Sequence, residues 1–226
     1  MSDALLRMET LADAWGPGDR RSIFARAYGT MTARMLAAIE AGEFEDDVWV
    51  ELLLHRFADY YFDAVEAYEN GADACPVIWH QAFDACREDG LHPLRVLFLG
   101  INAHINYDLA FTLADVLDTW SEMDEATRLA RHCDHERVND VIARTVDVVQ
   151  AEVVEPLAPE MGLIDRILGP VDEWAFSSLI ADWRSDTWLD ALALLEASPR
   201  SRPGVERRIE QRALGVAEHV MTLGPN

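Results

Sequence analysis

The central stretch of the chain reads LFLGINAHINYDLAF over residues 97–111. It is mostly apolar, yet polar side chains recur at every second position from Asn102 onward: Asn102, His104, Asn106 and Asp108. Apolar residues continue at helical spacing on both sides and leave no continuous polar face between Leu94 and Leu113. A helix of this kind is covered by neighbours on most sides. The sequence therefore predicts a central helix near residues 93–119.

The rest of the chain also predicts helices. Its apolar residues recur at i, i+3, i+4 and i+7, and no stretch shows the alternation of a strand. We expect an all-α fold of about seven to eight helices in a single domain over 1–226, since no Gly/Ser/Pro-rich linker divides the chain. A short helix is expected at 163–168. The main helices are expected at residues 4–15, 20–41, 45–69, 76–89, 93–119, 134–155, 171–197 and 204–222.

The charge balance is strongly acidic. Asp and Glu number 41 against 19 basic residues, all of them Arg, and the net charge is −22. Such a chain repels itself in dilute buffer, whereas at molar salt the Debye length falls to about 3 Å. The composition predicts a salt-rich, halophilic setting. A GC-rich genome would explain Arg in place of Lys but explains the acid excess less well.

Several classes of partner and location are disfavoured. No basic stripe is present for nucleic acid, because acidic residues interrupt the densest group of arginines, at 207–212. The first 15 residues lack the basic patch and apolar run of a secretory signal, and no uncharged membrane-spanning window is found. The three cysteines have no C-x-x-C spacing. We expect a reduced cytoplasmic protein without a membrane span or nucleic-acid partner, and its oligomeric state stays open.

Three successive predicted helices each carry a His-x-x-x-Asp motif: HRFAD at 55–59, HQAFD at 80–84 and HINYD at 104–108. Residues four apart share a helix face, so each motif places an imidazole beside a carboxylate. This mixed donor set suits zinc or manganese.

Helix geometry separates the three motifs. Asp84 has Arg87 as an i+3 partner, so the second motif is interpreted as a surface pair. In an up, down, up arrangement, His55 and His104 lie about 15 to 16 Å above their helix starts, at 1.5 Å per residue. The first and third motifs are therefore expected at one level.

We hypothesise that four residues converge to hold one divalent ion: His55, Asp59, His104 and Asp108. Nearby carboxylates would surround them: Asp63, Glu66 and Asp115. A bound zinc or manganese ion lowers the pKa of its water, which would support hydrolysis of a small-molecule or lipid-like ester or phosphoester, with Asp63 as general base. The alternative is a non-catalytic binding or scaffold protein in which the same polar network is structural.

Other polar residues have separate interpretations. Asn102 and Asn106 point about 160° away from the histidine face by helical count, and are interpreted as structural amides across a helix interface. Arg184, set between two tryptophans, is the arginine best placed to bind an anion from a small molecule. His132 and His135 could reach one ion, but Asp134 as a helix cap explains that stretch equally well.

The runs GINAHINYDLA and HRFADYYFDAV together resemble the signature of an uncharacterised family of bacterial and archaeal proteins, a domain of unknown function. The resemblance covers roughly residues 45–120. It implies that the four polar residues from Asn102 to Asp108 occupy signature positions, and it brings no established activity. The adjacent His-Asp pair of HD-type phosphohydrolases and the Glu-x-x-His pairs of ferritin-like proteins are absent. A P-loop and an H-E-x-x-H motif are absent as well.

Overall fold

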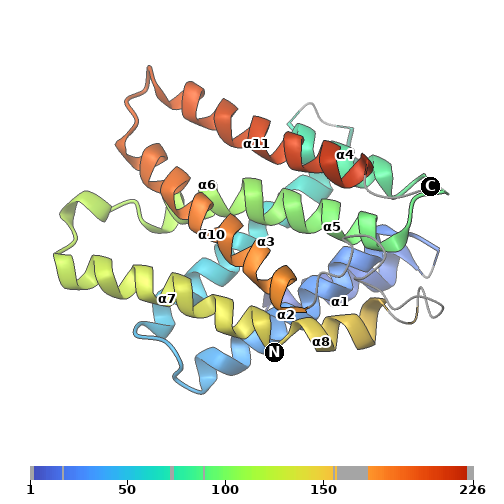
Figure 1. The fold of residues 1–226 in the computed structure, drawn as a ribbon, viewed down its shortest axis with the longest axis horizontal. Coiled ribbons are helices and arrows are strands. Elements are labelled where there is room, and N and C mark those ends of the chain that lie inside the picture. The colour runs from blue at the N-terminus through green and yellow to red at the C-terminus, as the bar shows by residue number, and fades with distance from the viewer. Residues whose placement is uncertain are drawn as a thin grey trace.

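The computed structural model describes residues 3–16, 18–71, 74–88, 90–154, 156 and 173–222. Every regular element in these ranges is helical, so the all-α prediction is confirmed (Figure 1). The longer helices are α1 (Asp3–Trp15), α2 (Arg21–Glu40), α3 (Asp47–Glu69), α4 (Val77–Ala85), α5 (Pro93–Ala103), α6 (Leu109–Val116), α7 (Glu125–Ala143), α10 (Glu173–Glu196) and α11 (Arg202–Thr222). Shorter elements are η1 (His104–Asp108), η2 (Trp120–Glu122), α8 (Val146–Val149) and η3 (Gln150–Val154).

The predicted central helix is present as α5, η1 and α6 in succession. These elements follow one another through the middle of the molecule, and α10 crosses over them (Figure 1). We call α5, η1 and α6 together the central rod. It contacts α2, α3, α4, α10 and α11. Its apolar side chains are buried or partly buried on every side, which is why the sequence has no polar face here.

The central rod is not a regular α-helix throughout. His104–Asp108 forms a π-helical turn, and the backbone N–H of Leu109 donates to the carbonyl of His104, five residues earlier. A π turn inserts one extra residue and is frequent at functional sites. The prediction of one continuous helix to residue 119 is therefore corrected: the helix changes form at His104 and ends at Val116.

Gly100 allows α2 to approach the central rod closely. A Cβ atom placed on Gly100 would lie only 2.6 Å from the ring of Phe24 on α2. Any larger side chain would have to displace that ring. Glycine at this position thus brings Phe24 against the part of the rod that leads into η1.

The start of α7 differs from the prediction. The helix begins at Glu125 rather than near 134, because Asp124 caps it by accepting the backbone N–H of Thr127 at 2.7 Å. Asp134 instead lies fully buried within α7. Its carboxylate accepts the backbone N–H groups of Glu45 and Asp46 at 2.7 and 2.9 Å, just before α3. The interpretation of Asp134 as the cap of its own helix was wrong. Its carboxylate binds the backbone that leads into α3 instead.

The remaining predicted helices agree within a few residues, except that α4 ends at Ala85 instead of 89 and a turn at 144–145 divides the expected 134–155 helix. The short helix expected at 163–168 lies outside the described residues. Within the described ranges, no helix has both the length and the apolar composition needed to cross a membrane.

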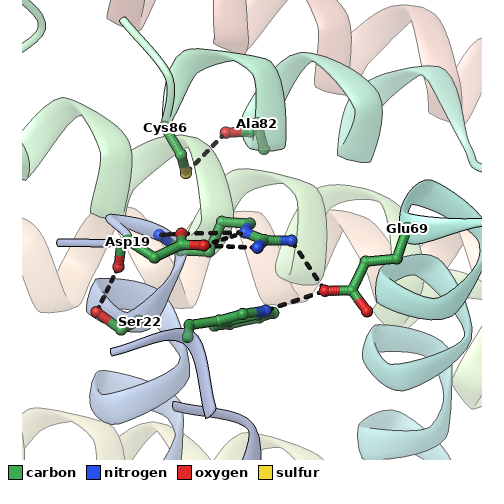
Figure 2. Close-up of polar contacts among 7 residues, drawn as sticks. Asp19, Ser22, Glu69, Ala82 and Cys86 are labelled. Carbon is green, nitrogen blue, oxygen red and sulfur yellow. Dashed lines mark hydrogen bonds and ion pairs between the residues drawn. The ribbon is translucent and has the colours of Figure 1, made fainter. Parts of the chain in front are cut away.

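A polar cluster joins the ends of three helices (Figure 2). Arg21, at the start of α2, makes ion pairs with Asp19 at 2.5 Å and with Glu69, at the end of α3, at 3.0 Å. The indole N–H of Trp15, at the end of α1, donates to the same Glu69 oxygen at 3.0 Å. Asp19 and Glu69 therefore serve as structural carboxylates. Together with Arg21 and Trp15 they hold the start of α2 against the ends of α1 and α3.

Candidate ligand site

A cavity of about 180 Å³ lies between the central rod and α2, α3, α7, α8 and α10. Its wall is almost entirely apolar, with few polar members: Tyr28, His104, Gln150 and Arg184. For comparison, an engineered cavity of about 150 Å³ lined by Leu, Ile and Phe binds benzene. This cavity is therefore large enough to hold a small organic molecule.

His104 and Asp108 form a buried pair on the π turn. Nδ1 of His104 lies 2.9 Å from Oδ2 of Asp108, and the two side chains are only 4% and 1% exposed. The indole N–H of Trp79, on α4, donates to the same Oδ2 at 2.9 Å. Both contacts of Oδ2 are thus made inside the protein, and they hold the Nδ1 edge of the imidazole toward the carboxylate.

Aromatic rings fix the plane of the His104 imidazole. Phe57 of α3 stacks on it with ring centres 3.5 Å apart and planes 8° apart. Tyr28 meets it edge-on at 4.4 Å, and the ring of Tyr61 lies 6.2 Å away. These contacts from α2 and α3 leave the imidazole one orientation, so the position of its second nitrogen is also fixed.

That second nitrogen, Nε2, is buried and makes no hydrogen bond with any described residue. The same is true of the hydroxyl groups of Tyr28 and Tyr61, whose rings surround it. Buried polar atoms in folded proteins nearly always have a partner, and each one without a partner needs an explanation. Nε2 of His104 and the hydroxyl of Tyr28 belong to residues of the cavity wall, and two such atoms indicate a place that receives a hydrogen-bonding ligand.

Burial pushes this cluster toward uncharged forms. It lowers the pKa of His104 well below its usual value. It raises the pKa of Asp108 well above its usual value, despite the hydrogen bond from Trp79, which acts in the opposite direction. Burial also raises the pKa of Tyr28. A neutral imidazole that directs Nδ1–H to Asp108 presents the lone pair of Nε2 as a hydrogen-bond acceptor or base.

Arg184 of α10 is a second polar member of the cavity wall and is only 3% exposed. Its Nε donates to Oδ1 of Asn139 at 2.8 Å, and Nη2 donates to the carbonyl of His135 at 2.7 Å. Both acceptors are neutral. Burial lowers the pKa of Arg184 to about 10, while the charge of Glu136 acts in the opposite direction.

The structure does not bring the four hypothesised metal ligands together. Nε2 of His55 lies 3.8 Å from Glu51 and its side chain is 38% exposed, while Asp59 is 47% exposed and lies 3.5 Å from Arg7. Among the described residues, no three His, Cys, Asp or Glu side chains are grouped to hold a metal ion. These residues do not fit a four-ligand centre, and zinc or manganese binding stays a prediction.

The physical reason is helix rotation. His55 and Phe57 are two residues apart on α3, so their side chains point about 200° apart at 100° per residue. Phe57 is the residue that stacks on His104, and His55 therefore points away. The prediction that His55 and His104 lie at one level along the bundle was necessary for them to meet. It did not determine which face of α3 packs against the rod.

The outer carboxylates are likewise at the periphery. Asp63 and Glu66 are exposed on α3. Asp115 pairs with Arg56 at 2.7 Å and accepts the hydroxyl of Tyr60 at 2.9 Å. The motif at 80–84 is a surface pair as predicted, since both its side chains are more than half exposed.

The asparagines of the signature make hydrogen bonds inside the protein, and one of these bonds crosses a helix interface. Nδ2 of Asn102 donates to the backbone carbonyl of Ala213 on α11 at 2.9 Å. Nδ2 of Asn106 donates to Oδ1 of Asn102, also at 2.9 Å. One face of the rod therefore anchors α11, and the other carries the buried imidazole.

Sequence reasoning missed the residues that surround His104. Tyr28 and Tyr61 come from apolar faces of predicted helices, where a tyrosine is ordinarily a core residue. Tyr28 lies in no motif, and Tyr61 falls within the run HRFADYYFDAV but was not singled out there. Trp79 stands directly before His80 in a motif interpreted as surface. Only the tertiary arrangement shows that its indole reaches Asp108.

Comparison with curated proteins and with solved structures finds no match. A family model described as a family of unknown function, DUF5995, matches residues 1–223. This match extends well beyond the 45–120 stretch that carried the resemblance. The chain therefore belongs to the DUF5995 family, a family of unknown function.

Proposed function

We propose that the protein binds a small, mainly apolar molecule that carries a hydrogen-bonding group, and that His104 recognises this group. The observation that carries the proposal is the buried, unpartnered Nε2 of His104 in the wall of an apolar cavity. Small-molecule sites are commonly apolar cavities with a few converging polar groups. The cavity, the fixed imidazole and the hydroxyl of Tyr28 match that description.

The expected contact follows from the tautomer. With Nδ1 held by Asp108, Nε2 accepts a hydrogen bond from a ligand hydroxyl, and the hydroxyl of Tyr28 is free to donate to the same ligand atom. Phe57 holds the ring in place, so little side-chain freedom is lost when the ligand binds.

Calorimetric titration with 1-octanol and its isomer 1-methoxyheptane tests this proposal at molar salt. The two probes have the same composition, but only the alcohol donates a hydrogen bond. We expect the alcohol to bind at least fivefold more tightly, and His104→Phe to abolish that difference, since a lost hydrogen bond corresponds to about 1 kcal/mol. His80→Phe, in the exposed motif, is the matched control and should retain it. Equal binding of both probes to the wild-type protein would contradict the proposal.

Hydrolysis of a lipid-like ester is a second candidate function, and the His104–Asp108 pair favours it. Nε2 would accept a proton from water as its oxygen bonds to the ester carbonyl carbon, and would return the proton to the departing alkoxide as the C–O bond breaks. Steady-state kinetics with 4-nitrophenyl hexanoate, compared between wild type and His104→Phe, test this role. A rate unchanged by the substitution would rule it out.

The metal-dependent form of that hydrolase is tested separately. If zinc or manganese is required, dialysis against a chelator removes the activity and one of these ions restores it. Activity unaffected by the chelator would contradict this form.

We also propose that the protein works in a salt-rich cytoplasm. The net charge of −22 supports this setting, because screening by molar salt relieves repulsion among surface carboxylates. Urea unfolding should give a midpoint that rises steadily with KCl concentration. A midpoint that does not change between dilute and molar KCl would contradict the proposal.

A further inference from the structure

The guanidinium of Arg184 is a buried cation that has no anionic side chain paired with it among the described residues. Its polar contacts are Oδ1 of Asn139, the backbone carbonyl of His135 and Nδ1 of His135, and none of these is an anion. Arg131 of α7 provides the contrast, because it is also largely buried but lies 2.7 Å from Asp46. A buried charge is costly unless it is paired, so the charge of Arg184 calls for a counter-ion.

The guanidinium has donors left for that counter-ion. Arginine carries five N–H groups, and Nε and Nη2 account for the bonds from Arg184 to side-chain or backbone acceptors. Nη1 makes no hydrogen bond with any described residue, and it is not among the fully enclosed unpartnered atoms. A carboxylate would match this planar set of donors well, because guanidinium groups bind it in a charge-assisted way.

The arginine stands at the end of an apolar stripe. Phe176, Ile180 and Arg184 all line the cavity and succeed each other every four residues on α10, which places them on one face over about 12 Å at 1.5 Å per residue. Val138 and Ile142 of α7 line the same cavity. A ligand with its charge at Arg184 would therefore have an apolar surface available for a hydrocarbon chain.

We propose that the cavity takes a medium-chain monocarboxylate of about eight carbons, with its carboxylate on Arg184 and its chain along Phe176 and Ile180. The chain length is chosen to match the stripe of about 12 Å from Phe176 to Arg184, along a cavity of about 180 Å³. One cation in an apolar wall matches a singly charged head group. This inference rests on the proposed function, since it names the ligand class of the same cavity.

The attraction between a ligand carboxylate and the guanidinium of Arg184 acts only at short range. The net charge of −22 repels anions at long range in dilute buffer, so the protein as a whole offers no general affinity for carboxylates. At molar salt this repulsion is largely screened, and the contact with a buried guanidinium is screened much less. Preference for a carboxylate under these conditions would therefore arise at Arg184.

Calorimetric titration at molar KCl with octanoate and 1-octanol tests the inference on the full chain. The wild-type protein should bind octanoate at least tenfold more tightly than the alcohol. Arg184→Gln should weaken octanoate binding by at least tenfold and alter octanol binding by less than threefold. Arg184→Lys keeps the charge and should restore part of the octanoate affinity. Arg131→Gln, which removes an arginine that already has a carboxylate partner, is the matched control.

The outcomes separate the two proposals. Equal affinity for octanoate and octanol, or octanoate binding unaffected by Arg184→Gln in a protein with wild-type circular dichroism, overturns the carboxylate inference while leaving the proposed function in place. Failure of both probes to bind the wild-type protein overturns both proposals. If Arg184→Gln does not fold, the comparison of the two probes on the wild type and on Arg184→Lys decides the inference alone.

Discussion

Two histidines are deeply buried in this protein, and their surroundings differ in an instructive way. His104, on the central rod, has one nitrogen beside Asp108 and one without a partner. His135, on α7, uses both nitrogens: Nε2 lies 3.1 Å from the carbonyl of Arg184, and Nδ1 lies 3.3 Å from Nη2 of the same residue. Burial lowers the pKa of both. In the first region, Nε2 of His104 lacks a hydrogen-bond partner among the described residues. In the second, the guanidinium of Arg184 beside His135 lacks a negatively charged partner among them.

The comparison shows which buried groups find no partner within the described part of the chain. A network that satisfies every atom and charge is sufficiently explained by stability. Here the unmet hydrogen bond belongs to His104 and the unmet charge to Arg184, and both side chains line the same cavity. A single molecule that brings a polar group and a carboxylate would satisfy both, which is why binding is the function that this arrangement supports.

The largest expected effect comes from removing the carboxylate of the His104 region. Asp108→Ala leaves the indole of Trp79 and Nδ1 of His104 buried without their acceptor, and opens a cavity. We expect the free energy of unfolding to fall by about 3 kcal/mol, measured by urea denaturation. Asp59→Ala, in the exposed motif, is the matched control and should lose less than about 0.5 kcal/mol. Similar losses in the two variants would show that the buried pair has no special role.

Acid titration should distinguish the two histidines. The folded pKa of His135 lies below its unfolded value because of burial and the neighbouring Arg184. Its contribution to stability is therefore present above about pH 6.5 and is lost as the pH falls below it, by about 1.4 kcal/mol per pH unit. His135→Gln should reduce this slope between pH 6.5 and 5.5.

The His104 region should add little to that slope. Burial lowers the pKa of His104, so the folded state releases a proton there, and raises the pKa of Asp108, so the folded state retains one. The two contributions to the slope therefore oppose each other. The double variant His104→Phe with Asp108→Leu should thus keep the wild-type pH dependence, and a slope lost in this variant rather than in His135→Gln would reverse the assignment.

The smallest expected effect concerns a hydroxyl. Tyr61 is fully buried and its hydroxyl has no partner among the described residues, whereas the hydroxyl of Tyr68 donates to Asp84 at 2.7 Å. Tyr61→Phe should therefore change the free energy of unfolding by less than about 0.5 kcal/mol, while Tyr68→Phe lowers it by about 1 kcal/mol. Thermal unfolding of the two variants provides the measurement. A large loss in Tyr61→Phe would mean that the hydroxyl is already satisfied.

The fold was largely predictable from the sequence because helical periodicity is a local property. The absence of a polar face around residues 97–111 correctly indicated the central rod. Asn102 was interpreted as an amide at a helix interface, and its Nδ2 donates to a carbonyl of α11. The start of α7 was missed because Asp134 looks like a cap, although its carboxylate serves residues 45 and 46, far away in the sequence.

The site was only half predictable for a similar reason. The local i+4 relation between His104 and Asp108 was identified from spacing alone, and the structure confirms their contact. The partner across the interface was not, because the rotation of α3 depends on packing and places Phe57 rather than His55 against the imidazole. The π turn also has no sequence signal that separates it from an α-helix.

The most direct test of the central claim is a nitrogen NMR spectrum of the protein labelled with ¹⁵N-histidine, recorded at pH 7 in molar KCl during titration with 1-octanol. We expect the signals of a neutral His104 with a proton on Nδ1 and a bare Nε2, and these signals should be absent from the spectrum of His104→Phe. The Nε2 resonance should shift as 1-octanol binds, while the resonances of exposed His80 stay in place. A His104 spectrum that does not change at saturating 1-octanol would contradict the claim that this imidazole and the cavity form one ligand site.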